Sequence, residues 1–233
     1  EKIAAVLDAF FGRQLSLKGK KVLVTAGPTY ERIDPVRFIG NFSTGKMGYA
    51  IAAEAARRGA DVTLVSGPTD LPDPAGSVNT VRVEIARQML AACESVFAQT
   101  DIAVMSAAVA DYAPKHFVDR KIKREHDSVD SIELVKNPDI AATLGACKRA
   151  GQLLVGFALE TGATADAEAN AREKLDRKNL DMIVLNTLAD KGAGFGTDTN
   201  KVTVIGRDFA EAFQLKSKAE VASDILDCIT DRL

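Results

Sequence analysis

The sequence has few of the residues that build metal sites and disulfide frameworks. Its 233 residues include three cysteines, two histidines and no tryptophan. Cys93, Cys147 and Cys228 lie far apart, without the CxxC spacing of a zinc site, and an odd, scattered set does not suit a disulfide framework. This cysteine usage fits a reducing compartment, so we expect a cytoplasmic protein.

Long apolar runs and a surplus of one charge are also missing. No run approaches the roughly 20 apolar residues that span a bilayer, and no signal peptide opens the chain. Thirty Lys and Arg face 32 Asp and Glu, which gives a net charge of −2. A general nucleic-acid binder needs a basic surplus. We therefore expect neither a membrane nor a nucleic acid as partner.

What is present is the composition of one globular domain, with 46% hydrophobic and 27% charged residues. Short apolar runs predict strands at 21–26, 62–65, 78–83, 102–105, 153–157 and 182–185. Helices are expected from 43 or 44 to 59, at 86–99, before 178, and from a Ser217 capping box to 233. This alternation predicts an α/β fold with a Rossmann-like, doubly wound, mostly parallel sheet, whose ligands bind at the carboxyl ends of the strands.

Two stretches depart from the alternation. Residues 113–136 are expected to form a protruding flap or dimerisation hairpin, and residues 189–206 a Gly-rich loop with one strand. Because the chain begins at Glu1, we expect it to be excised from a longer protein. Residues 1–18 are then a linker helix from an upstream domain, and residues 19–233 are the domain itself.

Segment 40–47, GNFSTGKM, resembles a phosphate-binding loop without matching it. Met47 stands where that loop needs a hydroxyl residue for magnesium, and about fifteen loop residues separate the segment from the preceding strand. We expect Ser43 or Thr44 to cap the next helix, whose free N–H groups suit an anion beside Arg37 and Asn41. Close packing of helix on sheet accounts equally well for the small residues here.

Other polar and aromatic residues follow the expected strands. Asp111 is placed to accept two hydrogen bonds from a ribose diol, or to cap or ion-pair within its loop. Asn137 or Pro138 is expected at the start of a helix. Phe157 is either core packing or a wall under a base.

Two lysine pairs complete the pattern. Lys121 and Lys123 would share one face of a strand, either toward a ligand or as a solvated edge. Lys174 and Lys178 share a helix face, where like charges repel unless an anion lies between them; a solvated charged face is the alternative. Together these features suggest a nucleotide triphosphate beside a second anionic substrate.

The motifs, in order, are T-A-G-P-T, N-x-S-[ST]-G-K-M-G, A-A-V-A-D-[YF], K-x-K, V-K-N-P-D-I, G-F-A-x-E-T and R-K-N-L-D. From about residue 19 to 204 they resemble the phosphopantothenate–cysteine ligase family of coenzyme A biosynthesis. The resemblance implies that 4′-phosphopantothenate attacks CTP to form an acyl-cytidylate and pyrophosphate, and that L-cysteine then displaces CMP. It also implies Mg²⁺ on the phosphates, a homodimer, and an upstream flavin-dependent decarboxylase domain.

The resemblance assigns roles to individual residues. Asn41 and Lys121 are expected to be catalytic, with Lys121 closing over the intermediate from the flap. Phosphopantothenate is expected to contact Arg37, Asn41 and Ala108. The expected contacts of CTP are Asp111, Lys121, Pro138, Asp139, Ile140, Ala141, Phe157, Lys174 and Lys178. Arg124 replaces the last lysine of the family's K-x-K-K flap, and Phe42 a common histidine.

Two other functions stay open. A nicotinamide-dependent oxidoreductase of the short-chain type needs a Tyr-x-x-x-Lys pair, and none of Tyr30, Tyr49 and Tyr112 has a lysine four residues later. A non-catalytic nucleotide-binding module would bind CTP but release no pyrophosphate in the presence of phosphopantothenate and cysteine.

Overall fold

A computed structural model describes residues 15–123, 131–161, 164–190 and 192–233. Its centre is an eight-stranded sheet in the order β13-β12-β10-β9-β6-β1-β4-β5. The six strands from β10 to β5 in this order are parallel, and β12 and β13 add to the β10 edge in antiparallel pairing. The strands are β1 (Lys21–Ala26), β4 (Asp61–Ser66), β5 (Val78–Arg82), β6 (Ile102–Met105), β9 (Leu153–Glu160), β10 (Met182–Thr187), β12 (Thr203–Gly206) and β13 (Ala210–Ala212).

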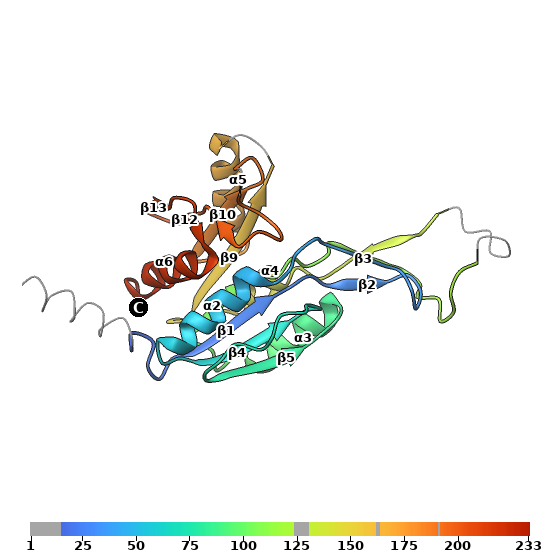
Figure 1. Cartoon of the computed structure of the whole chain (residues 1–233), viewed down its shortest axis with the longest axis horizontal. Coiled ribbons are helices and arrows are strands. Elements are labelled where there is room, and N and C mark those ends of the chain that lie inside the picture. Colours follow the sequence, from blue (N-terminus) through green and yellow to red (C-terminus); the bar gives the residue numbers. More distant parts are fainter. Residues whose placement is uncertain (1–14, 124–130, 162–163, 191) are drawn as a thin grey trace, which may run out of the picture.

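Helices cover both faces of this sheet (Figure 1). On one face, α2 (Lys46–Arg57) and α6 (Lys218–Thr230) pack with alternate strand residues such as Val22 and Val24. On the other, α3 (Ala86–Phe97), α4 (Ile140–Ala146) and α5 (Thr164–Arg177) pack with Leu23 and Ala103. Strands buried on both faces are apolar almost throughout, as β1 is. The predicted doubly wound, mostly parallel sheet is confirmed.

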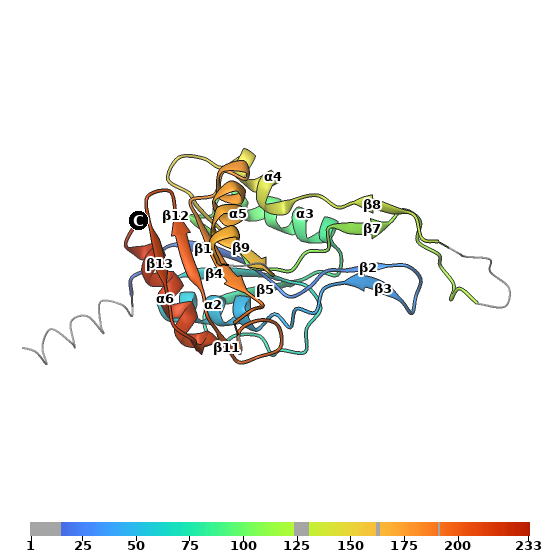
Figure 2. The same ribbon diagram turned by 90° about the horizontal axis from the view of Figure 1, so that it is seen from above.

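Two antiparallel hairpins extend from the body side by side (Figures 1 and 2). One pairs β2 (Tyr30–Arg32) with β3 (Phe38–Gly40), and the other pairs β7 (Tyr112–Pro114) with β8 (Leu134–Lys136). We call the described residues 30–40, 112–123 and 131–136 the arm. The protruding flap hairpin was predicted, whereas β2–β3 lies in a segment that the sequence suggested was a loop.

Local predictions met mixed outcomes at the helix starts. The capping box at Ser217 is confirmed, with Ser217 Oγ accepting from the Glu220 N–H. The prediction of Ser43 or Thr44 as the cap of α2 is wrong, because Gly45 in a left-handed conformation (φ 80°) precedes the helix. A backbone turn that needs positive φ replaces the side-chain cap there.

At α4 the cap is also one residue from the expected pair. Asp139 accepts a 3.1 Å hydrogen bond from the Ala142 N–H, while the Asn137 amide donates to the Ala110 carbonyl at 2.9 Å. Asn137 is therefore used to hold a neighbouring loop. The helix begins after Asp139.

Three further expectations concern boundaries. Leu17 is fully buried in the core, so the packing of the domain includes residues before 19; the predicted linker helix lies mainly in residues 1–14, outside the described residues. Lys121 and Lys123 are not in a strand, so their predicted common strand face is wrong. The Gly-rich segment contains β11 (Thr199–Asn200), paired with β14 (Lys216–Ser217), as well as β12.

None of the helices in the described part of the chain combines the length and apolar character that a membrane crossing requires.

Candidate active site

A cavity of about 500 Å³ opens at the carboxyl ends of the central strands. Its wall includes Thr25 from β1, Met105 from β6, and residues from the ends of β9 and β10. The chain leaves β1 toward β4 and leaves β6 toward β9, on opposite sides in the sheet order. Crevices at such a switch point are the usual ligand sites of open α/β sheets.

Most of the predicted site residues meet in this cavity. Arg37 and Lys121 are absent from its wall, and the other predicted residues line it. Those residues are Asn41, Ala108, Asp111, Pro138, Asp139, Ile140, Ala141, Phe157, Lys174 and Lys178. They come from five separate segments, so the fold has brought together what the sequence separates.

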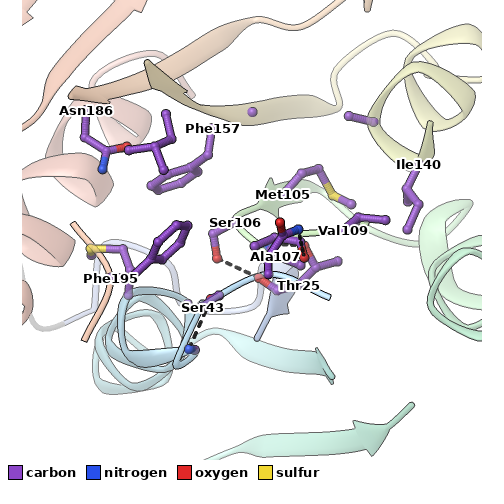
Figure 3. Close-up of a pocket in the computed structure, with 18 of the residues that line it drawn as sticks. Thr25, Ser43, Met105, Ser106, Ala107, Val109, Ile140, Phe157, Asn186 and Phe195 are labelled. Atoms are coloured by element: carbon purple, nitrogen blue, oxygen red, sulfur yellow. Dashed lines mark hydrogen bonds between the residues drawn. The ribbon is translucent and has the colours of Figure 1, made fainter. Parts of the chain in front are cut away.

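The segment after β6 is held against the end of β1 by hydrogen bonds. Ser106 Oγ donates to the Thr25 carbonyl at 2.6 Å, and Thr25 Oγ1 accepts from the Ala107 N–H at 3.2 Å (Figure 3). A Cβ on Gly48 would lie 2.6 Å from both Ala26 Cβ and Ser106 Oγ. The helix start therefore packs closely on the sheet, as one of the two interpretations predicted, and Gly48 and Ser106 both line the cavity.

Asn41 is oriented by the same segment. Its Nδ2 donates to the Ala108 carbonyl at 2.9 Å. A carboxamide nitrogen carries two N–H donors, so a second donor is available to a ligand in the cavity. Asp111 also lines the cavity and is exposed, and its backbone carbonyl accepts from the Asn137 N–H at 2.9 Å.

Lys174 of α5 and Lys178, the residue after the helix ends, each have a carboxylate partner beside the cavity. Lys174 Nζ lies 2.6 Å from Glu160 Oε1, and Lys178 Nζ lies 2.9 Å from Asp139 Oδ2. The hydrogen bond from Lys174 lowers the pKa of the Glu160 carboxyl group below its ordinary value. Both lysines line the cavity and pair with these two carboxylates, whereas their neighbours Glu173 and Asp176 pair with arginines.

Lys46, the lysine of the segment that resembles a phosphate loop, also lines the cavity but is engaged elsewhere. Its Nζ lies 2.7 Å from Asp198 Oδ1 and 3.1 Å from the Gly196 carbonyl. Lys218 lines the same side and is 8% exposed. Burial lowers the pKa of the Lys218 ammonium, and the nearby charge of Lys46 lowers it further.

Sequence reasoning missed several residues of this wall. Asn186 is near the carboxyl end of β10, where the rule for parallel sheets could have found it. Phe195 lies in the Gly-rich loop and Lys218 at the start of α6, and neither carried a local signal. Figure 3 places Phe157 and Phe195 with their rings pointing toward one another, beside Asn186.

Arg37 and Lys121 lie together on the arm. The Arg37 guanidinium pairs with Asp34 and donates to the Ile122 carbonyl at 3.0 Å, while the Ile122 N–H donates to Asp34 Oδ2 at 3.1 Å. The hydrogen bond from Arg37 holds the pKa of the buried Asp34 carboxyl well below its usual range. This cluster joins the two hairpins next to Lys121, outside the wall of the cavity.

The described residues contain no cluster of three or more His, Cys, Asp or Glu side chains that could hold a metal ion. Asp111 and Asp139 line the cavity with carboxylate oxygens, the donors that a hard cation prefers, and those of Asp139 also accept from the Ala142 N–H and pair with Lys178. Two such groups suit an ion that arrives on nucleotide phosphates and keeps several waters.

Comparison with known proteins places the chain in a family. Residues 17–233 match the model of the DNA/pantothenate metabolism flavoprotein C-terminal domain. The C-terminal domain of a coenzyme A biosynthesis bifunctional protein has a similar solved structure, with 45% identity and a TM-score of 0.78, covering 93% of this chain and 97% of that one.

Two longer relatives match almost the whole chain. The coenzyme A biosynthesis bifunctional protein of Vibrio cholerae is 43% identical over 100% of this chain and 57% of its own length. A protein of an unidentified prokaryote, named cysteine/cysteine sulfinic acid decarboxylase, is 48% identical over 97% of this chain and 63% of its own length. The chain thus spans about three fifths of these relatives. It belongs to the DNA/pantothenate metabolism flavoprotein C-terminal domain family, which confirms the ligase family that its motifs predicted.

Proposed function

We propose that this domain joins 4′-phosphopantothenate to L-cysteine, with CTP as co-substrate and an acyl-cytidylate as intermediate. The observation that carries the proposal is the convergence of Asn41, Asp111, Phe157, Lys174 and Lys178 on one cavity at the switch point of the sheet. They supply a carboxamide, a carboxylate, an aromatic wall and two cations. A nucleotide triphosphate beside an acid needs these groups.

In the first step the carboxylate of phosphopantothenate attacks the α-phosphorus of CTP, and pyrophosphate leaves. This step gathers negative charge, which cations must offset in the transition state. Lys174 and Lys178 are held at the cavity by Glu160 and Asp139. Bound Mg²⁺ would supply further charge to the phosphates. Since the attacking group belongs to the substrate, the protein needs no nucleophile of its own.

In the second step the amine of cysteine attacks the acyl carbon, and CMP leaves. The acyl oxygen becomes negatively charged in the transition state and requires a donor. Asn41 keeps one N–H of its amide on the Ala108 carbonyl, which fixes the plane of the amide and directs the other N–H. Asn41 is therefore our candidate for the oxyanion donor.

The homodimer remains a proposal, and the arm supports it. Arg37 and Lys121 are expected at the substrates but lie outside the wall of their own chain's cavity. The arm exposes apolar side chains that a second copy could cover: Val36, Phe38, Tyr112, Phe117, Ile132 and Leu134. We propose that the arm of one copy reaches the cavity of the other.

The wider context is likewise proposed. In the full-length protein we expect an upstream flavin-dependent decarboxylase domain and a cytoplasmic location. The bifunctional relatives are longer than this chain, which leaves room for another domain in those proteins. The order is chemically consistent, because a decarboxylase can act on the new carboxylate that cysteine brings into the product.

The test is to mix the protein with 4′-phosphopantothenate, L-cysteine and Mg²⁺, with CTP and ATP in parallel. We expect pyrophosphate and 4′-phosphopantothenoylcysteine in equal amounts, and faster with CTP. Omitting cysteine should leave acyl-cytidylate, detectable by mass spectrometry. Binding of CTP without pyrophosphate release in the full mixture would instead identify a non-catalytic nucleotide-binding module.

A further inference from the structure

Phe195 is an aromatic residue of the cavity without a role so far. It is 40% exposed and lies between Gly194 (φ 120°) and Gly196 (φ 78°), on the loop before β11. Positive φ on both sides lets the loop turn so that this one large side chain faces the cavity. Its ring and that of Phe157 point toward one another (Figure 3).

Two lysines hold the loop in this position. Lys46 bonds the Gly196 carbonyl and Asp198, as described above, and Lys218 Nζ donates to the Thr197 carbonyl at 2.6 Å and to the Gly194 carbonyl at 3.2 Å. The two lysines thus bond to residues both before and after Phe195 in the loop. A loop with several glycines would otherwise lose much of its order, because glycine has the greatest backbone freedom.

A polar group lies beside the two rings. Asn186 lines the cavity next to Phe157, and its carboxamide has no side-chain hydrogen bond with any residue in the described part of the chain. A carboxamide offers donors and an acceptor together. Two aromatic rings with such a group nearby suit a flat ring that carries hydrogen-bonding atoms.

We propose that Phe195 contacts the base of the nucleotide opposite Phe157, and that Lys46 and Lys218 are positioning residues that act through the loop. This inference rests on the proposed function, and it deepens that function. Phosphopantothenate and cysteine contain no ring, so the base is the one flat group among the three substrates. Stacking of a base on an aromatic side chain contributes about 1–3 kcal/mol.

The role of Lys46 differs from the one its motif suggests. In a phosphate loop the lysine contacts the phosphates directly. Here its ammonium is bonded to the loop that carries Phe195. If Lys46 acts only through Phe195, the effects of replacing both residues are not additive.

The experiment measures KM for each substrate and the Kd of CTP and of inorganic triphosphate by calorimetry. The variants are Phe195→Ala, Phe195→Tyr, Lys46→Met and the double variant Phe195→Ala/Lys46→Met. Lys216→Met is the matched control. Lys216 Nζ lies 2.7 Å from Asp224 of α6, the helix that begins at Lys218, but Lys216 is outside the cavity wall.

For Phe195→Ala we expect KM and Kd for CTP to rise roughly 5- to 100-fold. KM for the acid and for cysteine should stay unchanged, as should the Kd of inorganic triphosphate. Phe195→Tyr should retain CTP binding, and Lys46→Met should resemble Phe195→Ala. The double variant should be no worse than the weaker-binding single variant, and Lys216→Met should match the wild type.

Unchanged CTP affinity in Phe195→Ala overturns the inference, and so does an effect on KM for the acid alone. Additive effects, or weaker triphosphate binding in Lys46→Met, overturn the positioning role of Lys46. If the wild type binds CTP but forms no product, the proposed function fails while the Kd values still decide the role of Phe195. A wild type that binds no nucleotide overturns both.

Discussion

The body and the arm of this molecule are built in different ways. Central strands of the body such as β1 and β6 are buried on both faces between two layers of helices, whereas the arm consists of two-stranded hairpins with large apolar side chains in solvent. A two-stranded hairpin alone is marginally stable. The body therefore places its site residues through its own packing, while Lys121 on the arm needs a second copy, in our proposal, to reach a site.

The largest expected effect tests the arm. Lys121→Gln removes the charge but keeps a flexible polar side chain that is one atom shorter, and we expect product formation to fall at least about 100-fold because the transition state loses a cation. The circular dichroism spectrum should not change. Parallel assays of pyrophosphate and amide formation check this, and an unaffected turnover rate contradicts the role of Lys121.

A mixing experiment tests whether Lys121 reaches the cavity of its own chain or that of a second copy. Lys121→Gln protein and Asn41→Ala protein are each expected to be inactive. If an arm serves the partner's cavity, a mixed dimer has one site with both residues intact, and activity returns on mixing. If each arm serves its own body, every site in the mixture stays defective and no activity appears.

The next effect concerns the body. Asn41→Ala should lower kcat about 10²- to 10³-fold, or roughly 3–4 kcal/mol, because an oxyanion donor is lost. KM for CTP should remain as in the wild type. Asn79→Ala is the matched control, since Asn79 is an exposed asparagine of β5 outside the cavity wall. Equal loss in both variants would show that Asn41 has no special role.

Substitutions in the body and in the arm should also differ in their effect on the free energy of unfolding, by less than the effects on activity above. Leu64→Ala removes a fully buried side chain of β4 and should lower the free energy of unfolding by about 2–5 kcal/mol. Phe38→Ala removes a ring stacked on Tyr30 at 3.8 Å and should cost only about 0.5–1.5 kcal/mol. Urea unfolding followed by circular dichroism checks both, with exposed Leu233→Ala as the control.

The smallest effect is a pH dependence confined to the arm. Arg37 lowers the folded-state pKa of Asp34, so the contribution of Asp34 to stability is present above its ordinary pKa of about 3.9 and is lost as pH falls through the folded value. The Ile122 amide donates to Asp34, so its protection from hydrogen exchange should fall as the pH is lowered below about 3.9. Protection of the Val24 amide in β1 should change less over the same pH range. In Asp34→Asn this difference between acid and neutral pH should disappear.

Much of the body could be predicted from sequence because its signals are local. Apolar runs marked every strand from β1 to β10 in the central sheet, and the Ser217 capping box marked α6. The errors were of a different kind. Gly45 replaced Ser43 or Thr44 at the start of α2, and Asp139 replaced Asn137 or Pro138 at α4, because tertiary contacts decided which group satisfied the first N–H groups.

The order of motifs along the chain determined the family, the class of the sheet and most of the residues that line the cavity. The tertiary structure alone decided that Lys46 bonds the Gly-rich loop, that Asn186, Phe195 and Lys218 belong to the cavity, and that Arg37 and Lys121 lie outside its wall. The physical reason is the distance along the chain over which each kind of interaction acts. Periodicity and capping act over a few residues, whereas a cavity is made by side chains that only the packing of distant strands and loops brings together.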